Sequence, residues 1–169
     1  MRRIFLEFIC VVALLSVGVV HAQALPEPNG AVILTVSGKI THTNFGDRAV
    51  FDREMLEALE QKITETTTPW SETKDRYEGP LGRALLDAVG VEGAETMVIT
   101  ALNDYSAEVP VSDFMQIDVI LALKHNDAYM RVRDKGPLFV IYPFDDEPKL
   151  KNELYYNRSV WQIRAIEFR

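Results

Sequence analysis

The chain has 169 residues, with 18 lysines and arginines against 25 aspartates and glutamates, which gives a formal net charge of −7 at pH 7. Because no cluster of basic residues stands out, neither nucleic acid nor an anionic membrane surface is expected as a partner. The single cysteine, Cys10, lies in an apolar run near the amino terminus. A domain formed by the rest of the chain therefore has no disulfide, no thiolate nucleophile and no cysteine-ligated metal.

The amino terminus has the three parts of a secretory signal peptide. Arg2 and Arg3 give it a positive start, residues 8–20 are an uncharged apolar run, and residues 22–24 form the Ala-x-Ala pattern that signal peptidases accept. A retained membrane anchor is the alternative reading, but a spanning helix needs about 20 apolar residues. We predict cleavage after Ala24, which leaves no membrane anchor and carries the protein across the inner membrane to the periplasm.

Residues 25–30 are a polar leader, and residues 31–169 are numerous enough to bury a core as one domain. The first part of this domain, residues 31–37, is apolar and β-branched, which predicts a strand. Residues 41–48 are rich in turn-forming side chains and predict a loop.

A helix is expected to begin at Asp52, whose carboxylate is a good cap. Met55, Leu56, Leu59 and Ile63 fall on one helical face, so the predicted helix runs to about Ile63. The next sixteen positions, residues 64–79, are polar and read as a long connection carrying the aromatic residues Trp70 and Tyr77. Connections of this length in compact domains are usually functional or disordered.

The spacing of the leucines predicts a second helix over residues 81–89, with Pro80 in its first turn and Gly90 as its stop. A buried strand follows over residues 96–101. The chain then turns and returns as an edge strand over residues 106–111, where Pro110 limits pairing.

The remaining elements are mostly strands. Residues 118–124 and 128–132 are expected to flank a hairpin loop at residues 125–127. A loop over 133–137, a strand over 138–142, a helical turn over 152–156 and a last strand over 160–168 complete the order. Strict alternation assigns Val160, Gln162, Arg164, Ile166 and Phe168 to one face of that strand, and Trp161, Ile163, Ala165 and Glu167 to the other.

Helices come early and strands cluster late, so the order is not a regular βαβ repeat. The predicted fold class is α+β. We expect a mixed, largely antiparallel sheet with two or three helices.

Five segments carry a resemblance to a known family. They are residues 77–86 with a Gly-Pro-Leu entry into a helix, Asn-Asp-Tyr at 103–105 before Val-Pro-Val at 109–111, the hairpin at 118–127, Lys-Gly-Pro-Leu at 135–138, and residues 160–166 around Trp161. In this order they resemble the molybdopterin-binding domain of sulfite-oxidase-like oxidoreductases, over residues 30–169. The resemblance implies the α+β fold of that domain and, for a complete member, a molybdopterin cofactor and oxidoreductase activity.

The sequence departs from that family at the metal ligand. The resemblance implies a cysteine thiolate in the loop before the Gly-Pro-Leu helix, but residues 66–71 read Thr-Thr-Thr-Pro-Trp-Ser. Hydroxyls are poorer ligands than a soft thiolate for this metal, and no strong base nearby would ionise Ser71. The cations available for the pterin phosphate are few, namely Arg83, Arg131, Arg133, Lys135 and Arg164.

Three groups of residues are candidates for ligand binding. Asn103, Asp104 and Tyr105 form a turn whose phenol could point into a cleft, although the tyrosine could equally pack on the sheet edge. Asp104 replaces the glycine of the family turn, which aspartate tolerates because it accepts left-handed backbone angles.

Lys135, Gly136 and Pro137, with Arg131 nearby, could offer a cation and a backbone amide to an anion, or could form a plain loop. Trp70 and Tyr77 could stack on a flat ring, or could pin their long loop to the core.

Two other patterns are given structural roles. Asp145, Asp146 and Glu147 lack the alternating oxygen ligands of a calcium site and are expected to form a solvated turn. His42 and His125 are far apart in the sequence, and both fall in predicted loops, so no metal site is expected.

These observations favour an exported molybdopterin-binding-domain-like protein that is non-catalytic. It would bind a small anionic or flat ligand, or serve as an accessory or sensor for a partner protein of the cell envelope. The alternative is a molybdopterin-dependent oxidoreductase whose metal ligand is an oxygen or whose site a partner completes. No cofactor is expected from the residues themselves, and molybdopterin follows from the resemblance alone.

Overall fold

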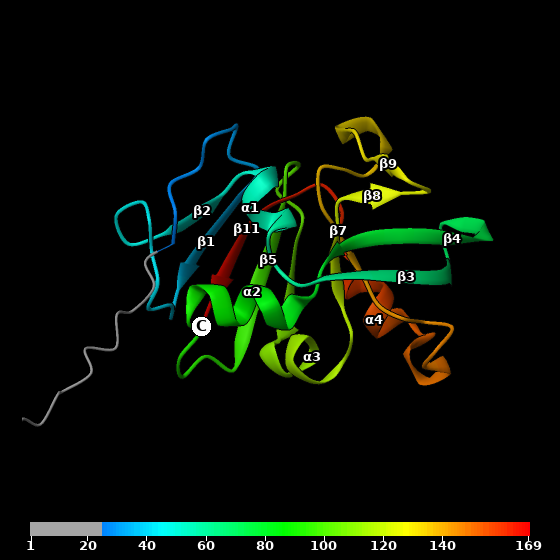
Figure 1. Cartoon of the computed structure of the whole chain (residues 1–169). Coiled ribbons are helices and arrows are strands. Elements are labelled where there is room, and N and C mark those ends of the chain that lie inside the picture. The colour runs from blue at the N-terminus through cyan, green and yellow to red at the C-terminus, as the bar shows by residue number, and fades with distance from the viewer. Residues whose placement is uncertain (1–24) are drawn as a thin grey trace, which may run out of the picture.

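The computed structural model describes residues 25–169 (Figure 1). The predicted signal peptide and its cleavage site therefore lie outside the described residues. The described part contains three sheets and several short helices. Within residues 25–169, no helix is long and apolar enough to cross a membrane.

The larger sheet has the strand order β2-β1-β11-β5-β6. Its strands are β1 (Leu34–Gly38), β2 (Ala49–Phe51), β5 (Thr96–Ala101), β6 (Ser106–Pro110) and β11 (Ile163–Phe168). Only the β1–β11 pair in it is parallel, so the last strand of the chain pairs beside the first. The predicted α+β class with a mixed, largely antiparallel sheet is confirmed. The strand predicted over residues 96–101 is found with those bounds.

A second sheet of four strands lies beside the first, in the order β3-β4-β8-β9, and β7 pairs with β10 in a third. These strands are β3 (Gln61–Thr68), β4 (Ser71–Pro80), β7 (Ile120–Ala122), β8 (Lys124–His125), β9 (Ala128–Tyr129) and β10 (Phe139–Ile141). In Figure 1 the β3–β4 hairpin projects away from the larger sheet.

Four α-helices are short: α1 (Arg53–Glu57), α2 (Gly82–Val89), α3 (Val111–Gln116) and α4 (Glu153–Arg158). Two 3₁₀ turns, η1 (Val132–Asp134) and η2 (Pro148–Leu150), lie in the later loops. The cap at Asp52 is confirmed, since its carboxylate accepts hydrogen bonds from the amides of Met55, Gly30 and Asn29. These bonds, that of Met55 first, lower the pKa of Asp52 and tie the leader to α1.

The prediction of a long connection over residues 64–79 is wrong, because this segment forms most of the β3–β4 hairpin. The helix predicted to reach Ile63 ends at Glu57 for the same reason. Thr64, Thr66 and Thr68 alternate as buried residues along β3, so the period is that of a strand. Polarity concealed this period, since buried threonines do not read as apolar. Pro80 ends β4 and does not begin α2.

The faces predicted for the last strand are also wrong. A register shift between Ile163 and Ala165 breaks the alternation, and Ile163, Ile166 and Phe168 are the buried residues. Trp161 lies before the strand, bridged to Phe139. A bulge inserts one residue into one strand only, and no composition rule at residues 160–168 indicates its position.

Smaller differences concern the bounds of elements. The helix α3 begins at Val111, which was assigned to the preceding strand. His125 belongs to β8, and the hairpin turn is Asn126–Asp127 alone, both with positive φ. The strand predicted to reach Val132 ends at Tyr129.

Gly79 allows two sheets to meet. A Cβ at this position would overlap the backbone of Leu121 and Ala122 in β7. The glycine of the Gly-Pro-Leu segment is therefore required by the close approach of β4 to β7, not by its own backbone angles.

Replacing Gly79 by alanine should destabilise the domain by about 2–4 kcal/mol, because the two strands must separate to admit the methyl group. Urea unfolding followed by far-UV circular dichroism measures this loss. Gly93→Ala is the control: its Cβ meets open space but its φ is +66°, so it should cost only about 1–2 kcal/mol. Equal losses for the two variants would refute the steric explanation.

Candidate functional site

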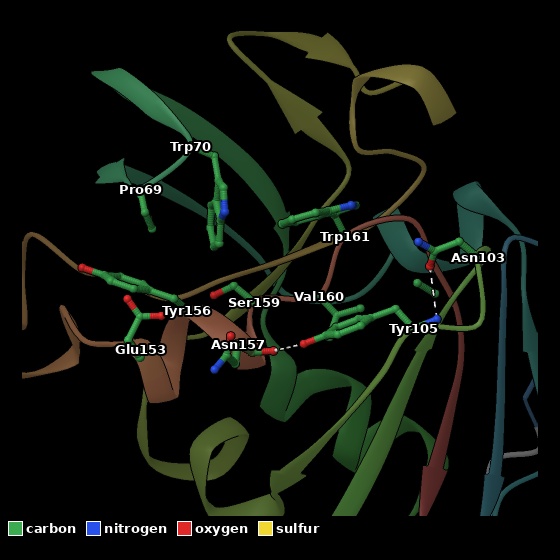
Figure 2. Close-up of a pocket in the computed structure, with 11 residues that line it drawn as sticks. Pro69, Trp70, Asn103, Tyr105, Glu153, Tyr156, Asn157, Ser159, Val160 and Trp161 are labelled. Atoms are coloured by element: carbon green, nitrogen blue, oxygen red, sulfur yellow. Dashed lines mark hydrogen bonds between the residues drawn. The ribbon is translucent and has the colours of Figure 1, made fainter.

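A pocket of about 390 Å³ opens where four segments of the chain meet. Figure 2 shows these segments: the turn of the β3–β4 hairpin, the β5–β6 turn, α4, and the residues that lead into β11. Its lining consists of Pro69, Trp70, Ala101, Asn103, Tyr105, Glu153, Tyr156, Asn157, Ser159, Val160 and Trp161. The volume is near the lower end of the range for small-molecule sites.

Trp70 lies at the centre of the aromatic wall. Its ring centroid is 5.4 Å from that of Trp161 and 6.3 Å from that of Tyr156, with interplanar angles of 78° and 74°. On its inner side it contacts Phe139, at 5.6 Å. The contacts with Trp161 and Tyr156 are nearly perpendicular, a favoured geometry of aromatic pairs, and the contact with Phe139 is tilted at 57°, so each ring holds its neighbours in place.

The opposite side of the pocket is polar and is fixed by its own hydrogen bonds. The Tyr105 hydroxyl donates to the Asn157 carbonyl at 3.1 Å, which joins the β5–β6 turn to α4 (Figure 2). The Asn103 side-chain oxygen accepts from the Tyr105 amide at 3.2 Å. The Ser159 hydroxyl donates to the Tyr155 carbonyl at 2.9 Å.

The hairpin turn that carries Trp70 is anchored by Asp145. The carboxylate of Asp145 accepts from the Thr67 amide at 3.0 Å and from its hydroxyl at 2.7 Å, and it pairs with Lys151 at 2.7 Å. The Asp145 amide in turn donates to the Thr66 hydroxyl at 3.1 Å. The hydrogen bond with Lys151, followed by those from Thr67, lowers the pKa of Asp145 to about 2. Asp145 lies in the predicted turn, in which Asp146 is exposed, but its own carboxylate is bound in this anchor and is not simply solvated.

Of the residues predicted from the sequence, Trp70, Asn103 and Tyr105 come together in the pocket. Asp104, between Asn103 and Tyr105 in the chain, is not part of the lining; it has φ +66°, and its carboxylate pairs with Arg164 at 2.6 Å. Asp104 therefore adopts the left-handed backbone conformation that aspartate was expected to tolerate at this position.

Tyr77 is not in the pocket wall. It is 4% exposed and stacks on His125, with the ring centroids 4.9 Å apart and nearly parallel. Burial raises the pKa of Tyr77 to about 12. Of the two roles considered for Tyr77, this position fits packing of its segment against the core and not stacking on a ligand in the pocket.

Arg131, Lys135, Gly136 and Pro137 also lie outside the lining. Arg131 pairs with Asp134 at 2.6 Å. The Lys135 carbonyl accepts from the Gln162 amide at 3.0 Å, so this loop supports the segment that carries Trp161. A Cβ at Gly136 would overlap the backbone of Met130, which leaves the loop no room for another residue there.

Sequence reasoning missed the other eight lining residues, namely Pro69, Ala101, Glu153, Tyr156, Asn157, Ser159, Val160 and Trp161. The helical turn at residues 152–156 was predicted, and it carries an aromatic pair. Nothing in the sequence indicated that this turn would face the β3–β4 hairpin, because the hairpin itself was read as a loop.

The sequence profile of the family described as oxidoreductase molybdopterin binding domain matches residues 51–145, more than half of the chain. The chain belongs to this family. The resemblance inferred from the five segments is therefore confirmed.

Among solved structures, the chain is similar to the sulfane dehydrogenase SoxCD from Paracoccus pantotrophus, with a TM-score of 0.59 and 18% identity. The similarity covers 80% of this chain but only 37% of that one, so the chain spans little more than a third of the neighbour's length. At this identity the likeness shows the fold alone. No curated protein matches the chain.

The residues of the pocket do not fit the cofactor that the family name implies. Within the described lining there is no thiol, no imidazole and no lysine or arginine, and the only carboxylate is that of Glu153. A molybdenum centre requires a strong ligand, and the anionic phosphate of a pterin cofactor requires cations. Residues 25–169 also contain no group of three or more His, Cys, Asp or Glu side chains arranged to hold a metal ion.

Replacing Asp145 by asparagine should destabilise the protein by about 2 kcal/mol at pH 7, as its lowered pKa implies. An aspartate with a depressed pKa stabilises the fold above its ordinary pKa of 3.8, and this contribution disappears as the pH falls through about 2. The stability difference from wild type should therefore shrink below about pH 4, as measured by urea unfolding across a pH series. Asp146→Asn, on an exposed neighbour, is the control and should change little. A difference that stays constant from pH 7 to pH 2 would contradict this reading.

Proposed function

We propose that this protein is an exported member of the oxidoreductase molybdopterin binding domain family that performs no molybdenum chemistry. It keeps the scaffold of the family and binds a small organic molecule in the aromatic pocket. In this role it serves the cell envelope as a ligand-binding accessory or sensor, acting on a partner protein.

The observation that carries this proposal is the composition of the pocket wall. Four aromatic side chains, namely Trp70, Tyr105, Tyr156 and Trp161, enclose a cavity with amide and hydroxyl groups but no metal-binding thiol. Such a mixture of apolar rings and a few convergent polar groups is typical of small-molecule sites.

The alternative is an oxygen ligand for the metal, and its candidates do not face the pocket. The Ser71 hydroxyl is within hydrogen-bond distance of the Thr73 hydroxyl and carbonyl, both at 3.3 Å. The Thr66 hydroxyl donates to the Thr67 carbonyl and accepts from the Asp145 amide. The nearby carboxylates, Asp75 beside Ser71 and Asp145 at the Thr67 hydroxyl, have lowered pKa values and are too weak as bases to ionise a hydroxyl, so the alkoxide that such chemistry needs has no support here.

Protein purified from the envelope of its native host should contain molybdenum and pterin at far below one per chain. Elemental analysis and fluorescence of released pterin measure both. Molybdenum near one atom per chain would refute the proposal and favour the catalytic alternative. A family member with an intact cysteine, purified in the same way, shows that the cofactor survives the procedure.

The same preparation tests ligand binding. Native mass spectrometry should show the chain with an additional small organic mass, which Trp70→Leu should lose because the leucine removes the central ring of the wall. Lys135→Ala, outside the lining, should keep that mass. If Lys135→Ala lost the additional mass and Trp70→Leu kept it, the ligand would bind outside the aromatic pocket.

A further inference from the structure

The electrostatic character of the pocket restricts the charge of its ligand. Glu153 is exposed and lines the pocket, and it forms no ion pair with another residue in the described part of the chain. Arg164 donates to the carbonyl of the lining residue Ala101 at 3.0 Å and is paired with Asp104. Lys151, beyond the hairpin turn, is paired with Asp145. The pocket therefore presents one uncompensated negative charge.

The rings add to this preference for positive charge. The faces of tryptophan and tyrosine attract cations, tryptophan most strongly. Trp70, Tyr156 and Trp161 are only partly buried, so their surfaces are accessible from the cavity. In Figure 2 the Glu153 carboxylate lies next to the Tyr156 ring, on the side opposite Trp161.

The angles between the rings restrict the shape of the ligand. Trp70 meets both Trp161 and Tyr156 at close to a right angle, 78° and 74°. Two parallel facing rings would form a slot for a planar molecule, whereas Trp70 forms a corner of nearly 90° with each of its two neighbours. Walls at right angles fit a compact, rounded group that touches several of them at once.

From these three features we infer that the pocket is an aromatic cage for a compact quaternary ammonium group, with Glu153 as its counter-charge. This inference rests on the proposed function and specifies its ligand class. Asn157 and Asn103 lie on the polar side of the cavity. Their amides can bind a hydroxyl on a carbon substituent of the ammonium ligand. The quaternary ammonium group itself offers no hydrogen-bond donor, so within this pocket that group is attracted only by the aromatic rings and by the Glu153 carboxylate.

Isothermal titration calorimetry of the mature protein with three probes tests the charge and the shape separately. Choline is the compact cation, 3,3-dimethylbutan-1-ol is its uncharged isostere, and N-methylpyridinium is a planar cation. Choline should bind at least about tenfold more tightly than the isostere, which lacks the cation–π attraction, and more tightly than N-methylpyridinium. Equal binding of choline and the isostere, or tighter binding of the planar cation, would overturn the inference.

Two variants locate the effect. Trp70→Leu should weaken choline binding about tenfold or more, and Glu153→Gln should weaken it about two- to fivefold while changing binding of the uncharged isostere little. Glu92→Gln removes the same charge from an exposed position outside the lining and should leave choline binding unchanged. Thermal unfolding of each variant confirms that it folds. Choline binding that is insensitive to Glu153→Gln, or as sensitive to Glu92→Gln, would refute the assigned counter-charge.

Failure of this inference and failure of the proposed function give different results. If none of the three probes binds while the purified protein still carries a small organic mass that Trp70→Leu loses, the ligand class is wrong and the proposed function stands. If molybdenum and pterin are present at one per chain, the proposed function itself fails.

Discussion

The contact of Trp70 with Phe139, Tyr156 and Trp161 is the interaction on which the site depends. It joins the turn of the β3–β4 hairpin to β10, to α4 and to the entry of β11, segments that lie up to 91 positions apart in the sequence. Each aromatic pair contributes about 0.5–1.5 kcal/mol beyond its buried area. Without this cluster the projecting hairpin would have few apolar contacts near its turn, and the pocket would have no wall on that side.

The anchor at Asp145 works together with this cluster. Its carboxylate holds Thr67 three residues before Trp70, so the turn is fixed by hydrogen bonds on one side and by ring contacts on the other. The scaffold of a family named for molybdopterin binding thereby presents aromatic faces and one carboxylate at its pocket. Fold and chemistry are separable in this way because the chemistry depends on a few side chains grafted onto the scaffold.

The order of the motifs was sufficient to predict the family and the α+β class. The strand at residues 96–101 and the helix ending at Gly90 were also predictable, because their periodicity is carried by apolar residues and their ends by glycine and turn formers. The β3–β4 hairpin was not predictable in the same way, since its buried residues before Gly79 are threonines, an aspartate and a tyrosine. The bulge at residues 163–165 depends on the pairing of β11 with β5, which a single strand does not encode.

The sequence by itself determined the charge balance, the confinement of cysteine to Cys10, and the presence of Trp70, Asn103 and Tyr105 as candidate ligand-binding residues. Only the tertiary structure decided that these three meet in one pocket while Tyr77 and the Lys135–Pro137 loop do not. It also brought Glu153, Tyr156 and Trp161 to the same wall. The physical reason is that a pocket is formed by side chains from segments distant in sequence, and their mutual angles follow from packing and hydrogen bonds that local propensity does not contain.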